Sequence, residues 1–421
     1  MLRGRHRGHP LPRRVVGSVL HQPRPRSHDL VEAARTQMET LAYYPNWGFA
    51  TGPATEAAAL IAARAPGDLD EVFFVSSGSE AVEAALKFAR SYHLSRGDTD
   101  RYKVIAREWA YHGTTLGALT VTGIPKFREP FAPMLWDGVH HVRHTLHDQP
   151  QPGAGPSSLA SVRAVEEAIL AEGPDTVAMV IAEPVQNGRG ALVPPDGYWP
   201  ELRRICDRYG VLLVADEVIN SFGRLGEFFG SIRYGVVPDM ITFAKGVTSA
   251  YQPLGGLVIR RPLVDAVWDS PLGSYMHGST FGGHPVATAV ACATIRALDA
   301  EDVPGHVRRE EARLADGLAA LATAHHCVRE VRGTGFFHAI ELMGDRGRDR
   351  PLTGQEAAAL QGGLLGTFLR EAGVLVRPDD RGATMLTIAP PLVADAGVLD
   401  DLLHRLDHVL DRTESWLSGS P

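Results

Sequence analysis

The stretch from Thr176 to Val218 contains two strand-like runs joined by a helix-like run. It reads TVAMVIAEP (Thr176–Pro184), DGYWPELRRICDRYG (Asp196–Gly210) and VLLVADEV (Val211–Val218). The outer two runs are short and continuously apolar, which is typical of strands buried on both faces. The middle run follows two prolines and ends at a glycine, as helices commonly do. This order predicts parallel strands of one sheet.

The same alternation extends along the chain in both directions. Strand-like runs occur at 71–76, 103–108 and 239–246, and helix-like runs follow the first two near Ser79 and Thr114. Apolar strands alternating with helices favour an α/β fold, in which helices cover both faces of a mostly parallel sheet. We therefore expect residues 29–300 to form one large domain of this kind.

The pattern changes after two helix-like runs that span roughly Pro285–Ala324. Shorter strand-like runs follow at 328–335, 336–342, 373–378 and 384–390, interleaved with helix-like runs at 355–372 and 395–411. This mixture predicts a smaller α+β domain, to which we assign residues 301–421.

The composition indicates a globular protein without a strong overall charge. The chain has 421 residues, of which 44% are hydrophobic, and a formal net charge of -7. This charge provides no basic field for nucleic acid, and no apolar run approaches the roughly 18 residues of a membrane span. The three cysteines are scattered and match no metal-binding spacing. We therefore expect a cytoplasmic protein that binds neither nucleic acid, membranes nor a metal.

Residues 1–28 differ from the rest of the chain. They contain seven arginines, four histidines and four prolines, but no acidic residue and no amphipathic period. A targeting peptide is the alternative, but an apolar core of secretory length is missing and prolines interrupt any helix. We expect this segment to be disordered.

Lysine is rare in this chain, and Lys245 stands out among its four lysines. Lys87, Lys103 and Lys126 occupy a polar helix face, the start of a strand-like run and a turn, respectively. Lys245 instead follows the apolar run MITFA, so we expect it at the carboxyl end of a strand, where open α/β sheets bind ligands. Arginine replaces lysine in most charged roles but not as an amine nucleophile, so a retained lysine is a candidate for chemistry.

Three further stretches place polar groups at the same sheet edge. SSGS (Ser76–Ser79) joins a strand to a helix and is suited to an anion, although serine followed by glutamate is also an ordinary helix start. Asp216 and Glu217 end another strand; an acid pair also suits a metal, but no phosphate-binding P-loop precedes it. Tyr111 precedes His112 and Gly113 at a third strand end, where an aromatic ring can stack on a ligand.

An amine, a carboxylate and an anion cradle together indicate pyridoxal 5'-phosphate. This cofactor needs an amine for its imine, a carboxylate that keeps its ring nitrogen protonated, and a site for its phosphate. Each of the three signals is weak alone, and each supports the other two.

From about His28 to its C-terminus the chain resembles the class III aminotransferases, which are fold-type I pyridoxal phosphate enzymes. The resemblance rests on SSGSEAVEAALKFAR, YHGTTLGAL, AEPVQNGRG, DEVINSFGR, FAKGVTSAYQPLGG, STFGGHP and APPL, which occur in the family's order. It implies an aspartate aminotransferase-like fold with a seven-stranded sheet, and an omega-aminotransferase activity that moves an amino group from an amine or omega-amino acid to a keto acid such as pyruvate by a ping-pong mechanism.

The resemblance also implies roles for individual residues. It makes Lys245 the lysine that forms a Schiff base with the cofactor and Asp216 the partner of the pyridine nitrogen. The other cofactor contacts that it implies are Ser77, Gly78 and Ser79 at the phosphate, Tyr111 and Val218 on the two ring faces, His112 behind the site, Glu183 near the ring hydroxyl, and Thr280 at the phosphate of a neighbouring subunit. It implies substrate contacts for Trp47, which would line the amine pocket, and Arg377, which would bind the keto acid carboxylate.

Two alternatives stay open from these residues. The same scaffold carries aminomutases, racemases and decarboxylases, and the site residues alone do not separate these from a transaminase. The family's usual opening segment, which lines the substrate pocket, has no counterpart in residues 1–28. A cofactor-binding protein with little activity is therefore the second alternative.

Because Thr280 would reach a neighbouring site, a homodimer or higher homo-oligomer is expected.

Overall fold

The computed structural model describes residues 27–151 and 153–419 of the chain. The prediction of disorder for residues 1–28 therefore lies outside the described residues, apart from Ser27 and His28. His28 begins helix α1 (His28–Thr40), and the backbone amide of Ser27 donates a hydrogen bond to the Tyr251 hydroxyl at 2.7 Å.

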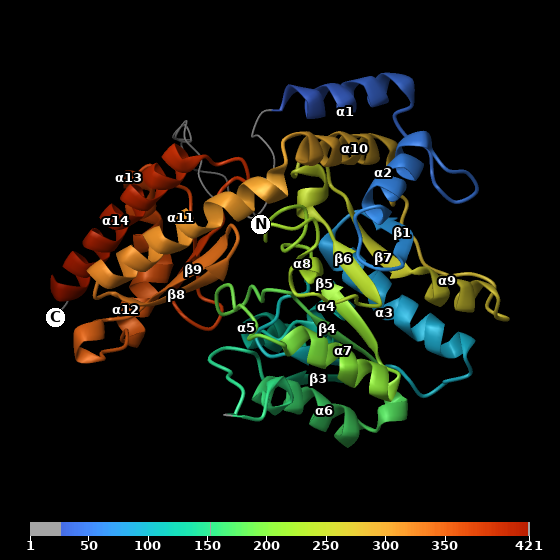
Figure 1. Cartoon of the computed structure of the whole chain (residues 1–421), viewed down its shortest axis with the longest axis horizontal. Helices are drawn as coiled ribbons and strands as arrows, with labels where there is room; N and C mark the ends of the chain where they lie inside the picture. Colours follow the sequence, from blue (N-terminus) through green and yellow to red (C-terminus); the bar gives the residue numbers. More distant parts are fainter. Residues whose placement is uncertain (1–26, 152, 420–421) are drawn as a thin grey trace.

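A seven-stranded sheet forms the centre of the larger part of the molecule (Figure 1). Its order is β1-β7-β6-β5-β4-β2-β3. The strands are β1 (Leu69–Val75), β2 (Lys103–Arg107), β3 (Val139–Val142), β4 (Val177–Ala182), β5 (Leu212–Asp216), β6 (Met240–Phe243) and β7 (Gly255–Arg260). Only β7 runs antiparallel, to both β1 and β6, and the other pairings from β6 to β3 are parallel. The predicted mostly parallel sheet is therefore confirmed.

Helices cover both faces of this sheet. Alternate residues of one strand enter different cores: Met179 and Ile181 of β4 pack in one cluster, and Val180 and Ala182 pack in the other. A strand packed on both sides must be apolar at every position, which explains the continuous runs. The covering helices are α2 (Gly52–Ala62), α3 (Gly78–Ser95), α4 (Leu116–Val121), α6 (Ala160–Glu172), α7 (Tyr198–Tyr209), α9 (Arg261–Trp268) and α10 (Pro285–Ala300), with the single turns α5 (Pro125–Arg128) and α8 (Gly230–Arg233).

The C-terminal part forms a second, smaller sheet with helices on it (Figure 1, left). Its four strands are antiparallel in the order β10-β11-β9-β8. They are β8 (Val328–Thr334), β9 (Phe337–Leu342), β10 (Arg377–Asp379) and β11 (Met385–Ile388), and the helices are α11 (Val303–Ala324), α12 (Gly354–Ala359), α13 (Leu365–Glu371) and α14 (Ala396–Gly419). The predicted boundary after residue 300 falls between α10 and α11 and remains a proposal.

The structure differs from the sequence predictions at several elements. The strand predicted at 373–378 begins only at Arg377, and α14 continues to Gly419 instead of ending near residue 411. Strands β3 and β7 and helix α1, which lies against α10, were not predicted. Within the described ranges, no helix is both long and apolar enough to cross a lipid bilayer.

Candidate active site

Lys245 lies between two adjoining cavities at the carboxyl edge of the large sheet. Strand β6 ends at Phe243, and Lys245, with a φ of 43°, starts the 3₁₀ turn Lys245–Thr248. Its side chain lines one cavity of about 340 Å³ and another of about 760 Å³. The predicted position after a strand is therefore confirmed.

Burial changes the acid–base behaviour of Lys245. Desolvation lowers the pKa of its ammonium from 10.5 to about 8, against the attraction of the Asp216 and Glu183 carboxylates, which raises it. Two arginines, Arg381 and Arg377, add a smaller lowering. With this pKa about a tenth of the amine is unprotonated at pH 7, and this is the nucleophilic form.

Asp216 stands at the end of β5 and is held on three sides. His112 Nδ1 lies 2.7 Å from its Oδ2, and the Thr242 hydroxyl and the Val218 amide donate to its Oδ1 at 3.0 and 3.2 Å. The carboxyl is 3% exposed and lines the smaller cavity. This network presents a fixed carboxylate to a ligand in that cavity.

The neighbouring acid, Glu217, takes no part in this site. Its carboxylate accepts the amide hydrogens of Gly230 and Ser231, the latter at 2.9 Å, and it lines neither cavity. The metal-binding alternative for the pair Asp216 and Glu217 therefore lacks the shared geometry it requires.

Glu183 is a second buried carboxyl, after strand β4. It accepts the amides of Tyr111 at 3.1 Å and of Asn187 at 2.9 Å. Burial, with a contribution from the nearby Asp216 charge, raises its pKa, while His112 lowers it. Through these amides Glu183 fixes the loop that carries Tyr111.

The N-terminus of α3 forms a narrow cradle beside these acids. The Ser77 hydroxyl caps the helix by accepting the Glu80 amide at 3.2 Å, and the Ser79 hydroxyl accepts the Thr114 amide at 3.1 Å. A Cβ atom at Gly113, whose φ is +133°, would lie 2.5 Å from Ser79 Oγ. The amides that open a helix have no partner within it, so this cradle suits an anion.

Tyr111 and Val218 both line the smaller cavity. The Tyr111 ring makes an edge contact with Phe127, at 6.0 Å between centroids, and the Arg381 guanidinium lies 5.7 Å from its centroid. Val218 packs so close to Gly78 that a Cβ there would lie 2.9 Å from its Cγ1. A flat ring between Tyr111 and Val218 would have an aromatic and an aliphatic neighbour.

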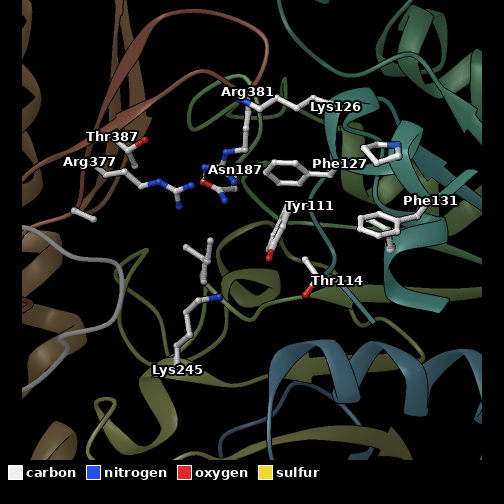
Figure 2. Close-up of a pocket in the computed structure, with 14 residues that line it drawn as sticks. Tyr111, Thr114, Lys126, Phe127, Phe131, Asn187, Lys245, Arg377, Arg381 and Thr387 are labelled. Atoms are coloured by element: carbon white, nitrogen blue, oxygen red, sulfur yellow. Dashed lines mark hydrogen bonds between the residues drawn. The ribbon is translucent and has the colours of Figure 1, made fainter. Parts of the chain in front are cut away.

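The larger cavity has an arginine end and an aromatic end (Figure 2). Arg377, at the start of β10, and Arg381, in the following loop, come from the small sheet, whereas Phe127 and Phe131 come from the segment after α4. Tyr111 and Lys245 line both this cavity and the smaller one. A substrate in the larger cavity therefore reaches the Lys245 amine.

The structure brings ten of the twelve predicted site residues together and leaves two apart. Those that line the two cavities are Ser77, Gly78, Ser79, Tyr111, His112, Glu183, Asp216, Val218, Lys245 and Arg377. Trp47 and Thr280 line neither cavity of this chain; both are exposed, and Trp47 borders a separate hollow with His277 and Gly278.

Trp47 and Thr280 share one outward surface, formed by residues 43–49 and 276–284. The Tyr43 hydroxyl donates to the Thr280 carbonyl at 2.7 Å, and the Tyr43 and Phe281 rings are 5.8 Å apart. We call this the 43–49/276–284 surface.

Arg381, Thr242 and the aromatic segment with Phe127 were not predicted from the sequence, because no local pattern distinguishes them.

The chain matches known families over most of its length. Residues 25–410 match the family model described as aminotransferase class-III. A probable aminotransferase of Mycobacterium tuberculosis is 44% identical over 91% of this chain and 82% of the relative. A putrescine–pyruvate aminotransferase of Pseudomonas aeruginosa is 36% identical over 91% of this chain and 83% of its own.

Solved structures resemble the chain equally well. An (S)-enantioselective omega-transaminase from Thermomicrobium roseum has a TM-score of 0.84 and 36% identity, covering 92% of this chain and 86% of that one. The omega transaminase from Pseudomonas jessenii, solved in complex with PMP, has a TM-score of 0.86 and 31% identity, with coverages of 94% and 87%.

Proposed function

Because this chain belongs to the class III aminotransferase family, we propose that it transfers an amino group from an amine or omega-amino acid to a keto acid such as pyruvate, with pyridoxal 5'-phosphate held in the smaller cavity. The observation that carries the proposal is the Lys245 amine, with its pKa of about 8, beside Asp216 and at the junction of the two cavities. The relatives with a named activity are transaminases, which favours a transaminase over an aminomutase, racemase or decarboxylase.

The residues of the smaller cavity fit this cofactor. The α3 cradle, too tight for a side chain at Gly113, would hold the phosphate with Ser79. Asp216 would pair with the ring nitrogen, and Tyr111 and Val218 would lie on the ring faces. When bound, pyridoxal phosphate supplies an electrophilic carbonyl carbon and an electron-withdrawing pyridinium ring.

The chain's own residues then account for proton movement. The unprotonated Lys245 Nζ would act as nucleophile and as general base, taking a proton from the carbon that bears the substrate's amino group and holding it on the amine until it is returned. A pKa of about 8 suits this exchange near neutral pH, because both protonation states are populated. His112 holds the Asp216 carboxylate in its orientation through their 2.7 Å contact.

Arg377 supports recognition of the keto acid. It lines the larger cavity together with Lys245 and makes no ion pair with the described residues, so its guanidinium is available for a carboxylate. Arginine binds carboxylates through two parallel hydrogen bonds. The amine and the keto acid would occupy the same cavity in turn, as a ping-pong mechanism allows.

We further propose a homodimer or higher homo-oligomer and a cytoplasmic location. The 43–49/276–284 surface carries both Trp47 and Thr280, and Trp47, Phe49 and Phe281 on it are 69%, 71% and 58% exposed. Such apolar exposure is characteristic of an interface. A second copy would bring Thr280 to a neighbouring phosphate and Trp47 to a substrate pocket.

The proposed function is tested by a product assay. Purified protein with added pyridoxal phosphate, a primary amine and pyruvate should form alanine, and double-reciprocal plots at several pyruvate concentrations should be parallel. Formation of a rearranged, racemised or decarboxylated product without alanine, or intersecting lines, would contradict the proposal.

A further inference from the structure

The larger cavity has a one-sided charge pattern. Apart from Lys245, three cationic side chains line it, Lys126, Arg377 and Arg381, and its described lining contains no carboxylate. The remaining polar groups, on Thr114, Asn187, Thr387 and Tyr111, are neutral amides and hydroxyls. They accept hydrogen bonds but do not compensate a charge.

Two of the three cations are already neutralised by partners outside the lining. The Arg381 Nε lies 2.8 and 2.9 Å from the two carboxylate oxygens of Asp379, and both side chains are buried. Lys126 pairs with Asp380. Arg377 has no ion-pair partner in the described part of the chain, so the wall retains a net positive charge at this end.

The opposite end of the cavity is apolar. Phe127, Phe131, Pro130 and Leu119 line it, and Figure 2 shows the two phenylalanine rings across the cavity from Arg377. Phe131 is 48% exposed, so part of its ring remains for a ligand to cover. A substrate that buries apolar surface here is stabilised by the hydrophobic effect.

We infer that the cavity discriminates against diamines and that, among donors without a carboxylate, it prefers a monoamine whose chain or ring beyond the reacting nitrogen is apolar. This rests on the proposed transaminase function. The second ammonium of a diamine would lose its water beside a net positive wall, with no carboxylate to replace that hydration. An apolar tail instead gains the contact with Phe127 and Phe131. Putrescine, the substrate named for one relative, is therefore a poor donor for this chain.

Pentylamine and putrescine test this directly, because they differ only by a methyl group in place of the distal ammonium. The amine half-reaction is followed on the cofactor-loaded protein without keto acid, through the absorbance change of the bound cofactor. We expect the rate constant per unit concentration for pentylamine to exceed that for putrescine at least tenfold. A putrescine rate equal to or above the pentylamine rate overturns the inference and leaves the transaminase function standing.

A matched pair of variants isolates charge from shape. Phe131→Glu places a carboxylate at the apolar end, and Phe131→Gln has nearly the same size without the charge. We expect the ratio of putrescine to pentylamine rates to rise at least fivefold in Phe131→Glu relative to Phe131→Gln, with both variants retaining the melting temperature of the parent to within a few degrees. Equal ratios in two folded variants would contradict the inference.

The equilibrium affinity of each amine for the Lys245→Ala protein gives a readout independent of turnover. This variant lacks the reacting lysine and is titrated without cofactor, so no imine can form and calorimetry reports the non-covalent binding of each amine. Pentylamine should bind at least tenfold more tightly than putrescine, and the reverse order would contradict the inference. Conversion of neither amine by the parent protein, while pentylamine still binds more tightly, would count against the transaminase function but support the cavity's preference.

Discussion

At the scale of single residues, the lowered pKa of Lys245 connects burial with reactivity. Desolvation disfavours the ammonium, so the neutral amine predominates above pH 8 instead of above 10.5. At pH 7.5 about a quarter of the side chains are neutral, compared with about 0.1% for an ordinary lysine. The cofactor-free protein should therefore capture pyridoxal phosphate at a rate that rises with pH around a midpoint near 8, measured by stopped-flow absorbance.

The control for this rate is Lys245→Ala. It should fold normally, as judged by circular dichroism, and should show neither capture nor turnover. A midpoint near 10.5 in the parent protein would contradict the effect of burial. A borohydride-reducible cofactor adduct on another lysine of Lys245→Ala would show that the reactive amine has been assigned to the wrong residue.

Arg377 supports a prediction that separates the two substrates. Replacing Arg377 by Ala removes a charge-assisted pair with the keto acid, at a cost of about 1.5 to 3 kcal/mol, or roughly 10- to 150-fold in the apparent KM for pyruvate. An amine without a carboxylate makes no such pair, so its half-reaction should change less than threefold. Steady-state and single-turnover kinetics measure the two effects, and equal damage to both would indicate a structural role.

The predictability of the site differs from residue to residue. Asp216 and Lys245 stand at the ends of strand-like runs and Tyr111 closely follows one, so their position at one sheet edge follows from local patterns and parallel topology. Arg381 and Thr242 contact Tyr111 and Asp216, which are 270 and 26 positions away in the chain. Such contacts depend on how the two sheets pack and on strand register, which local patterns do not specify.

At the scale of elements, the α3 cradle depends on a glycine outside the helix. In Gly113→Ala the new methyl group meets Ser79 Oγ and Ala118 Cβ, at 2.5 and 2.9 Å in the present geometry. Ser79 must then move, and its hydrogen bond from the Thr114 amide weakens. We expect affinity for pyridoxal phosphate, measured by fluorescence titration, to fall at least tenfold.

Gly97→Ala is the matched control for Gly113→Ala. Gly97 also has a positive φ, +85°, but a Cβ there has nothing within 4 Å. Both variants carry the backbone strain of a non-glycine residue at positive φ, of order 1 to 3 kcal/mol. Only Gly113→Ala should lose cofactor affinity. Equal affinities in the two variants would contradict the assignment of the cradle.

The elements themselves were predicted where one physical signal dominates. The buried parallel strands β4, β5 and β6 are apolar except for Asp216 and Thr242, and their lengths separate them from helices. Strand β7 was not predicted, because it opens with Gly255 and Gly256 and glycine does not favour strands. In the fold, Phe243 Cζ would lie 2.3 Å from a Cβ at Gly256, so a larger residue does not fit there. Packing against a neighbouring strand, instead of local propensity, selected these glycines.

At the scale of the whole molecule, the 43–49/276–284 surface leads to a prediction about assembly. We expect a second copy of the chain to cover this surface in a dimer. Phe281→Arg places a charge on it, so this variant should be monomeric and should bind the cofactor less tightly. Leu170→Arg, on α6 at the other end of the large sheet, starts from similar exposure, 54% against 58%, and should leave the dimer intact. Analytical ultracentrifugation and cofactor content measure both effects. A parent protein that sediments as a monomer with full cofactor content would contradict the proposal.

Strand β7 has a further consequence, for the biogenesis of the protein. Strand β1 lies at the edge of the sheet and pairs only with β7. During synthesis Val75 therefore has no pairing partner until Gly255 has been made, 180 positions later in the chain. At a synthesis rate of about 5 to 20 residues per second, this delay lasts roughly 10 to 40 s. During this delay β1, the apolar strand that leads into the phosphate cradle, has no sheet partner. We therefore expect chaperones to bind the nascent chain. Cofactor capture is therefore a late event, which follows the emergence of β7 from the ribosome.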